Sequence, residues 1–355
     1  MISAGGLHGR RRETLPRQKV HRSERESFMR TALRLALACG LLALSAGAGR
    51  ADEITLNAAH FTPAQNSFAQ SFLKFVDKVN AAGKGVVQIQ VRGGPEVIPP
   101  GQLGLAQKNG LIDMINAPAG QYLEIVPEGE AFSASTKLPQ EVRENGGWDL
   151  MQKIFGEKGN AHLLAHVDAG TGFNIFTVDE PTRSEDGGMV WSSLKIRSSP
   201  LYRQFFETLG MTVIVLPPGE VYTSLERGVI NANAYPVFGY KSFGWDKFTK
   251  WRVDPSFFQT DVLISMNKSK WDSLSPEAQK ILTDVAIAYE QESLEAIRTE
   301  NQRQADEMVA EGQQVFELQG KGREEFLAKA AKASWDRMES RDPTYVPELR
   351  KHFQN

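Results

Sequence analysis

The residue whose type and position best suit ligand chemistry is an arginine at the end of a predicted strand. Arg197 closes the stretch Leu194-Lys195-Ile196-Arg197. Open sheets of parallel strands bind ligands just outside the carboxyl ends of those strands. A guanidinium there presents a rigid fork of donors that matches a carboxylate. Arg197 is therefore a candidate carboxylate-binding residue, and the alternative is a salt bridge that only ties two lobes together.

Aromatic residues at similar positions complete this candidate site. Tyr235 follows one predicted strand, Phe61 follows another, and Tyr122 lies just beyond a loop. A cleft with aromatic walls and one arginine suits a small organic acid. For each aromatic taken singly, structural packing is an equally good explanation. Trp245 and Trp251 are expected in the core.

Two histidines have the spacing of a metal pair on a helix, but the sequence around them favours a strand. His162 and His166 are four residues apart, which in a strand separates them by about 13 Å, too far for one ion. The chain also lacks a G-x-S-x-G elbow, a phosphate-binding loop and an H-E-x-x-H motif. We therefore expect no metal, no cofactor and no enzymatic activity.

The elements that must position these residues alternate between strand and helix. In the second half, strands are predicted at 194–197, 212–216 and 229–232, with helices at 202–209 and 220–227.

The first half repeats the same β-α-β-α-β pattern. Strands are predicted at 54–59, 86–91 and 112–115, with helices at 63–82 and 102–109. Two such units in one chain indicate two similar lobes.

Three further segments complete the prediction. Strands are expected at 161–168 and 173–178, and the run 257–266 can return the chain to the first lobe. From Ser275-Pro276-Glu277 a helical pattern continues to about Gly312, which corresponds to a helix of roughly 50 Å.

The N-terminal region has the three parts of a secretory signal. A basic start at Met29 is followed by an apolar core, 35–44, and by small residues up to Ala51. We predict a signal peptide at 29–51 and interpret residues 1–28 as the product of a start codon placed too far upstream. The alternative for residues 1–28 is a functional basic arm. The single cysteine, Cys39, lies in the apolar core, so the mature protein would contain no disulfide.

Charge excludes several classes of partner. Residues 1–51 hold ten Lys or Arg and three Asp or Glu, so without them the 41 basic and 43 acidic residues become 31 and 40. A net charge near −9 argues against nucleic acid and anionic membrane as partners. An anionic ligand must then be captured by a specific arginine.

Several motifs, in order, resemble those of one transporter family. They are Leu-Lys-Ile-Arg at 194–197, Glu-Val-Tyr-Thr-Ser-Leu-Glu-Arg-Gly-Val-Ile at 220–230, Gly-Leu-Ile-Asp-Met at 110–114 and the step into the long helix at 267–277. The chain resembles the solute-binding subunits of tripartite ATP-independent periplasmic (TRAP) transporters, of the DctP type.

The resemblance implies a fold with a defined division of the chain. The expected fold is the α/β two-lobe fold of periplasmic solute-binding proteins, type II-like, with a long helix that spans both lobes. Lobe I would comprise 52–171 and 261–301, and lobe II would comprise 172–260 and 302–355.

The resemblance also implies a function and partners. The protein would capture a small organic acid in the periplasm and deliver it to the membrane-embedded transporter subunits, and we expect it to be a monomer. One alternative is a receptor that presents its ligand to a sensor kinase. Another is a periplasmic lyase or hydrolase on the same fold.

In the resembled family, the position of Arg197 receives the ligand carboxylate. Several members have a second arginine in the preceding strand, where this chain has Asn174. A neutral hydrogen bond is expected from Asn174, which provides no countercharge for a second carboxylate. The expected ligand therefore has a single carboxylate, with a 2-oxo or 2-hydroxy group or an aromatic body.

The remaining candidate ligand-binding residues also come from positions in this resemblance. Tyr235 replaces the asparagine of sialic-acid-type members and the tryptophan of 2-oxoacid-type members. Ala234 replaces the glutamate that binds metal in the latter, so no bound cation is expected. Pro118 replaces a glutamate of the sialic-acid type, and Tyr222 lies within the matching 220–230 motif.

Overall fold

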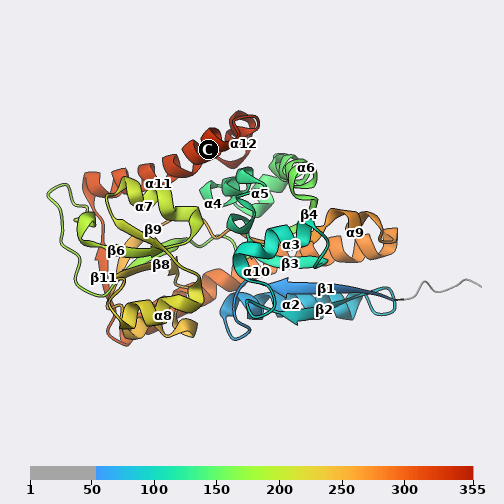
Figure 1. Cartoon of the computed structure of the whole chain (residues 1–355), viewed down its shortest axis with the longest axis horizontal. Coiled ribbons are helices and arrows are strands. Elements are labelled where there is room, and N and C mark those ends of the chain that lie inside the picture. Colours follow the sequence, from blue (N-terminus) through green and yellow to red (C-terminus); the bar gives the residue numbers. More distant parts are fainter. Residues whose placement is uncertain (1–52, 355) are drawn as a thin grey trace, which may run out of the picture. The chain divides into compact units, whose positions relative to one another are not determined.

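The structure, a computed structural model, describes residues 53–354. It shows two β-sheets, each with parallel and antiparallel strands, and helices packed on them (Figure 1). The predicted signal peptide and the residues before it lie outside the described range. We call the part built on the first sheet the first lobe and the part built on the second sheet the second lobe. The predicted two-lobe α/β fold is confirmed.

The first lobe holds a five-stranded sheet in the order β2-β1-β3-β10-β4. The strands, in chain order, are β1 (Ile54–His60), β2 (Val87–Gly93), β3 (Met114–Pro118), β4 (Ala161–Val167) and β10 (Val262–Asn267). Strand β1 runs parallel to β2 and β3, and β10 runs antiparallel to both of its neighbours.

Helix α2 (Ser67–Ala82) shows why the chain folds locally as predicted. The side chain of Asn66 caps its first turn by accepting the Phe68 N–H, and the chain leaves the helix at Gly83. The buried residues Phe68, Phe72 and Phe75 recur at helical spacing and face the core. Helix α3 (Leu103–Lys108) connects β2 to β3 in the same unit.

The second lobe holds a six-stranded sheet in the order β11-β9-β5-β8-β6-β7. The strands, in chain order, are β5 (Phe173–Thr177), β6 (Lys195–Ser198), β7 (Thr212–Val215), β8 (Ala232–Pro236), β9 (Trp251–Phe257) and β11 (Gln314–Glu317). Strand β6 is parallel to β7 and β8. Helix α7 (Arg203–Thr208) connects β6 to β7, and helix α8 (Pro218–Glu226) connects β7 to β8.

One strand lies further along the chain than predicted. The pattern placed it at 229–232, whereas β8 spans Ala232–Pro236. Residues 227–231 instead form the turn that ends α8, where the Val229 N–H binds the Ser224 carbonyl. As a result Tyr235 lies within a strand and not after one.

The long helix α10 (Pro276–Ala310) contacts both lobes. Ser275 caps its first turn, and the N-terminal half packs on α2 and β4. Near its other end, Asn301 Oδ1 accepts the Phe238 N–H and Gln304 Oε1 accepts the Gly239 N–H, both at 2.9 Å. The predicted helix that links the two lobes is therefore present.

The other helices pack around the first lobe or follow α10. They are α4 (Glu130–Ala134), α5 (Pro139–Glu144), α6 (Gly147–Gly159), α9 (Lys268–Asp272), α11 (Gly320–Arg341) and α12 (Val346–Phe353). Within residues 53–354, no helix combines the length and the apolar composition that a membrane span needs.

The last helix departs from the predicted division of the chain. The sequence placed all of 302–355 in the second lobe, but α12 packs on α4 and α6. Its residues Leu349 and Phe353 are fully buried in the apolar cluster of the first lobe, and the ring of Phe353 meets that of Phe132 edge-on at 5.5 Å. Burial of this apolar face accounts for its position.

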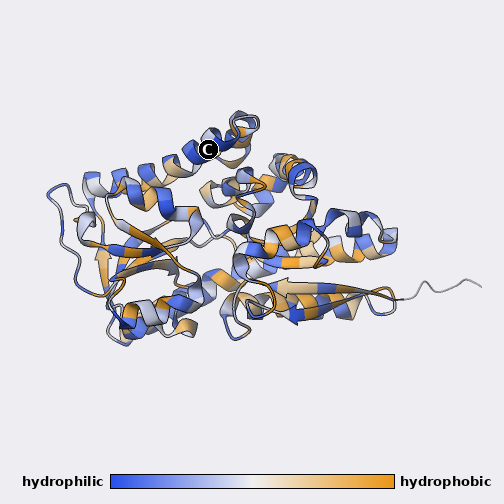
Figure 2. Cartoon of the chain, viewed as in Figure 1, coloured by the Kyte–Doolittle hydropathy of each residue, from blue (hydrophilic) through white to orange (hydrophobic). Residues whose placement is uncertain are grey.

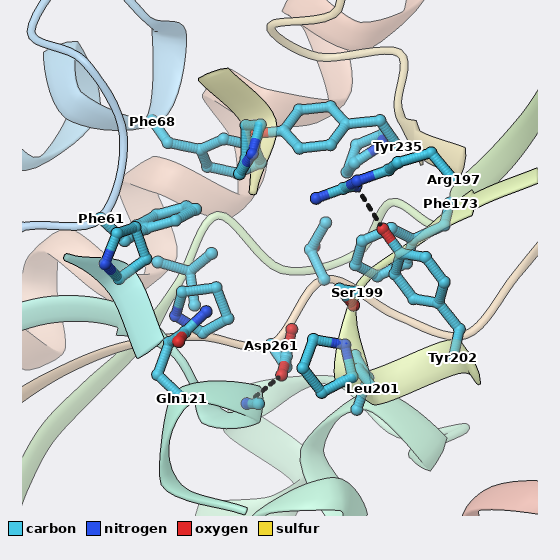
Figure 3. A pocket seen from close by; sticks show the side chains of 18 residues that line it. Phe61, Phe68, Gln121, Phe173, Arg197, Ser199, Leu201, Tyr202, Tyr235 and Asp261 are labelled. Carbon is cyan, nitrogen blue, oxygen red and sulfur yellow. Dashed lines mark hydrogen bonds between the residues drawn. The ribbon is translucent and has the colours of Figure 1, made fainter. Parts of the chain in front are cut away.

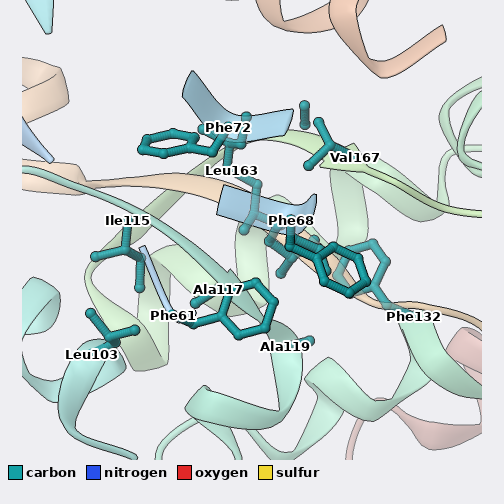
Figure 4. Packing of buried hydrophobic residues seen from close by; sticks show 14 of the residues in the cluster. Phe61, Phe68, Phe72, Leu103, Ile115, Ala117, Ala119, Phe132, Leu163 and Val167 are labelled. Carbon is teal, nitrogen blue, oxygen red and sulfur yellow. The ribbon is translucent and has the colours of Figure 1, made fainter. Parts of the chain in front are cut away.

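Apolar residues concentrate on the strands and on the helix faces that cover them (Figure 2). The larger core cluster surrounds the first sheet, where Phe72, Ile115 and Leu163 lie between strands and helices (Figure 4), and it continues into the second lobe around α8. At its edge, Phe61 and Phe68 pack together with ring centres 5.6 Å apart. These two rings also form part of the candidate site.

Candidate functional site

A cavity with walls from both lobes contains Arg197 and encloses about 80 Å³ (Figure 3). The first lobe supplies residues that follow β1 and β3, and the second lobe supplies residues from the ends of β6 and β8. A single water needs about 10–15 Å³ of such space, so the cavity has room for more than one water-sized group. A small ligand therefore fits it.

Arg197 is 3% exposed, and its guanidinium points into this cavity (Figure 3). Its Nε donates to the Leu216 carbonyl at 2.9 Å, and its Nη1 donates to the Tyr202 hydroxyl at 2.9 Å and to the Ala234 carbonyl at 3.3 Å. Among the described residues, no carboxylate pairs with Arg197 and Nη2 has no acceptor. A buried cation without a counterion is costly, so the site favours an anion.

Two tyrosines line the cavity together with this guanidinium. Tyr202 accepts from Arg197 and donates to the Ala234 carbonyl at 2.9 Å. Tyr235 is buried, and its hydroxyl has no hydrogen-bond partner among the described residues. Burial raises the pKa of Tyr235 well above its usual value, so this hydroxyl stays protonated. It can therefore donate a hydrogen bond to an oxygen atom of a bound ligand.

An acidic residue lies on the other side of the cavity. Asp261 is 1% exposed, and its Oδ2 accepts the Gly120 N–H at 3.1 Å. Burial raises the pKa of Asp261 to about 7, against the backbone N–H groups of Gly120, Asp261 and Ala119, which lower it. In Figure 3 the Asp261 carboxylate and the Arg197 guanidinium extend toward the same space.

Apolar rings form the rest of the walls. Phe61 and Phe68 line the cavity from the first lobe, and the ring of Phe68 meets that of Tyr235 edge-on at 6.2 Å. Phe173 lines it from the second lobe, and Pro118 lies at the end of β3. The structure thus brings together four of the residues proposed from the sequence: Arg197, Tyr235, Phe61 and Pro118.

Two tyrosines proposed from the sequence lie elsewhere. Tyr122 is fully buried in the first lobe, where its hydroxyl binds Gln107 Oε1 and Ser265 Oγ, the latter at 2.8 Å. Tyr222 lies on α8 and packs edge-on against Phe248, with ring centres 4.9 Å apart. Neither tyrosine lines the cavity. The ring of Tyr122 packs in the core of the first lobe, and the ring of Tyr222 packs on the surface of α8.

Asn174 does not line this cavity either. Its amide donates to the Val253 carbonyl at 3.1 Å and to Asp254 Oδ1 at 2.7 Å. It borders separate surface hollows with Asn301 and Gln302 of α10. Strand β9 therefore engages the amide that was expected to face the ligand.

The two histidines have separate structural partners. The ring of His162 stacks on Trp271 at 3.8 Å, and His166 Nε2 lies 2.7 Å from the Thr260 carbonyl. Burial lowers the pKa of both, to about 4 for His162. Within residues 53–354, no three His, Cys, Asp or Glu side chains are grouped to hold a metal ion.

The sequence interpretation missed several lining residues. These are Phe68, Gln121, Phe173, Ser199, Tyr202 and Asp261. Two of them carried a usable signal. Tyr202 follows Arg197 by five residues in the same strand-to-helix connection, and Asp261 is the only charged residue between Pro255 and Asn267.

Two lobes joined by a long helix, with the Arg197 guanidinium buried in the cavity that both lobes line, have the architecture of a ligand-binding receptor. Residues 58–342 match the model of the bacterial extracellular solute-binding proteins, family 7, and the chain belongs to this family. The earlier resemblance to DctP-type TRAP solute-binding proteins is thereby confirmed.

Individual relatives agree with this assignment. The chain is 31% identical over 255 residues to the 2,3-diketo-L-gulonate-binding periplasmic protein YiaO of Escherichia coli, covering 68% of this chain and 75% of that protein. A Bordetella pertussis extracytoplasmic solute receptor, DctP7, which binds pyroglutamic acid, has the same fold, with a TM-score of 0.73. It is 16% identical, over 85% of this chain and all of that one.

A TRAP transporter solute-binding protein of Bordetella bronchiseptica, solved with calcium and picolinate, gives the same TM-score of 0.73. That protein is 18% identical, over 85% of this chain and 92% of that one. At such identities the likeness concerns the fold alone.

Proposed function

We propose that this protein captures a small monocarboxylate between its lobes and delivers it to the membrane subunits of a TRAP transporter. One observation carries the proposal. Arg197 is buried in a cavity with walls from both lobes, and no carboxylate among the described residues neutralises it. A ligand carboxylate would supply the missing charge.

Closure would strengthen the interaction. With the lobes apart, water hydrates the guanidinium, and the ligand carboxylate replaces that water. When the lobes close, the local dielectric falls and the ion pair strengthens. The Tyr235 hydroxyl, which lacks a protein partner, would donate to the same carboxylate. Phe61, Phe68 and Phe173 would cover the apolar part of the ligand.

The cavity also supports the choice of a single carboxylate. Arg197 is the only Lys or Arg among the residues that line it, and Asn174 lies outside it. A second carboxylate would therefore be buried without a countercharge, which costs several kcal/mol. We propose that a 2-oxo acid, a 2-hydroxy acid or an acid with an aromatic body is preferred over succinate, malate or a sialic acid.

The experiment is a thermal-shift screen over organic acids, followed by calorimetry of the strongest ligand on wild type and on Arg197→Ala. Loss of a buried charge-assisted contact costs about 3–5 kcal/mol, so we expect affinity to fall at least a hundredfold. Arg203→Ala is the matched control, because Arg203 is exposed and pairs only with Glu207.

Two outcomes would contradict the proposal. If Arg197→Ala folds, as judged by circular dichroism, and binds with wild-type affinity, Arg197 is not in the site. If succinate or malate stabilises the protein more than every monocarboxylate, the single-carboxylate assignment is wrong.

We further propose that the protein works in the periplasm as a monomer, after removal of residues 29–51. The relative YiaO is a periplasmic protein, and the basic, apolar and small-residue parts of this segment follow the order of a signal peptide. Mass spectrometry of the exported form should find its N-terminus at or near Asp52. Intact residues 1–28 on that form would contradict both the start-site and the cleavage assignments.

A further inference from the structure

The cavity contains a second charged group that the proposed function does not use. Asp261 belongs to the connection 258–261 that leads into β10, and it lines the cavity. Its main chain is fixed, because the Asp261 carbonyl accepts the Ala119 N–H at 2.8 Å. Its carboxylate extends toward the space that Arg197 enters from the other lobe (Figure 3).

The protein leaves this carboxylate without a cationic partner. The Gly120 N–H binds Oδ2 at 3.1 Å, the backbone N–H groups of Asp261 and Ala119 also stabilise the ionised form, and within residues 53–354 no Lys, Arg or His forms an ion pair with it. Asp261 and Arg197 also form no ion pair with each other. A buried carboxylate can accept two or more further hydrogen bonds, and leaving it without them is costly.

Anchoring the Gly120 loop does not explain a charged residue here. An asparagine could accept the same N–H without placing a charge in a buried site. A carboxylate and an amide would interact differently with a ligand in the cavity. The carboxylate accepts hydrogen bonds from N–H or O–H groups of the ligand and repels ligand oxygens that can only accept hydrogen bonds. Burial raises the pKa of Asp261 to about 7, and a donor from the ligand would favour the ionised form.

We propose that the captured acid carries, besides its carboxylate, a hydrogen-bond donor, N–H or O–H, that Asp261 accepts. This inference rests on the proposed function, since it assumes that Arg197 holds the carboxylate. The ionised Asp261 carboxylate would repel a carbonyl or ring oxygen at the corresponding position, so among the acids of the proposed function a 2-hydroxy acid would bind more tightly than a 2-oxo acid.

The first test compares isosteric acids on the wild-type protein. L-Pyroglutamate has a lactam N–H where its lactone analogue, 5-oxotetrahydrofuran-2-carboxylate, has a ring oxygen, and L-lactate has a hydroxyl where pyruvate has an oxo group. We expect the donor-bearing acid of at least one pair to bind at least tenfold more tightly by calorimetry than its partner. Equal affinity within both pairs, or tighter binding of the acceptor acids, would overturn the inference.

The second test changes the protein. Asp261→Asn keeps an oxygen for the Gly120 N–H but also presents an NH₂ donor, so we expect the preference within the binding pair to reverse. General loosening of the site would weaken both acids and would not reverse their order. Asp149→Asn, at an exposed position of α6, is the matched control. A folded Asp261→Asn protein that keeps the wild-type preference would refute the role of Asp261.

Failures of the two proposals are distinguishable. If no monocarboxylate of the wider screen binds, or if Arg197→Ala binds as well as wild type, the proposed function fails. If acids bind through Arg197 without preference for a donor, only the inference about Asp261 fails. If Asp261→Asn does not fold, the wild-type comparison of the isosteric pairs still decides the question.

Discussion

At the scale of single residues, Arg197 is oriented before any ligand arrives. Three protein acceptors engage Nε and Nη1, while Nη2 has none among the described residues. The plane of the guanidinium is therefore fixed with one edge free, which lowers the ordering cost of binding. A lysine could not make the same contacts, because an ammonium group lacks the planar fork.

The ionisation of Asp261 predicts a pH effect on stability. Its pKa is raised from 3.8 to about 7 in the folded protein, so the folded state holds this proton more tightly than the unfolded state does. The unfavourable effect of ionisation is absent below about pH 4, grows as the pH rises, and is complete above about pH 7. We therefore expect wild type to lose stability relative to Asp261→Asn across this range.

The measurement is denaturant unfolding of both proteins, without ligand, at about pH 4 and about pH 8. Each pKa unit corresponds to about 1.4 kcal/mol, so the difference should change by a few kcal/mol at most. Glu130 is the ionisable neighbour whose pKa Asp261 influences, and it is present in both proteins. A stability difference that does not vary with pH would mean that Asp261 is not buried as an acid.

Residue types at strand ends predicted part of the site. Arg197, Tyr235, Phe61 and Pro118 line the cavity. Tyr122 was misplaced because a hydroxyl can also be satisfied inside a core, and only the fold brings Gln107 and Ser265 to it. Asp261 was missed because its partner Gly120 is 141 residues away in the chain, a contact that no local pattern reveals.

At the scale of elements, helix α11 connects the lobes through one buried arginine. Arg337 Nε donates to Glu130 of α4, and the guanidinium also donates to the carbonyls of Pro200 and Leu201 in the second lobe. Glu130 is fully buried. We expect Arg337→Met to lower the free energy of unfolding by about 3–5 kcal/mol, because the buried Glu130 would lose its hydrogen-bonded ion-pair partner and would have to take up a proton or remain charged without it.

Chemical denaturation of the single variant and of the double variant Arg337→Met, Glu130→Gln separates the charge from the packing. The double variant should recover more than half of the loss, because it removes the unpaired carboxylate. If the two variants are equally unstable, the contacts to Pro200 and Leu201 dominate instead of the ion pair.

Hydrophobic periodicity and helix-breaking residues predicted most elements, and two exceptions, β8 and α12, have different causes. Ser275 and Pro276 marked the start of α10 correctly, because capping is encoded in adjacent residues. For β8, the β-branched Val229 and Ile230 were taken as strand, although the chain uses them in the turn after α8. The position of α12 depends on contacts with α4 and α6, which the sequence around it does not show.

At the scale of the whole molecule, the negative net charge of the protein disfavours an anionic ligand, whereas Arg197 in the cavity favours it. The chain without residues 1–51 has a net charge near −9, so its overall field does not attract an acid. On the proposed function the attraction is confined to Arg197, and on the inference drawn above Asp261 selects for a hydrogen-bond donor near the carboxylate. Selectivity on this account comes from two buried side chains and not from the surface.

The division of the cavity walls between the lobes has a kinetic consequence. Arg197 belongs to the second lobe, and Asp261, bound to Gly120, belongs to the first. If both proposals hold, an acid bound to Arg197 and Asp261 bridges the lobes, so each opening of the lobes breaks at least one of its contacts. The rate of lobe opening would then contribute to the rate at which the acid is released to the membrane subunits.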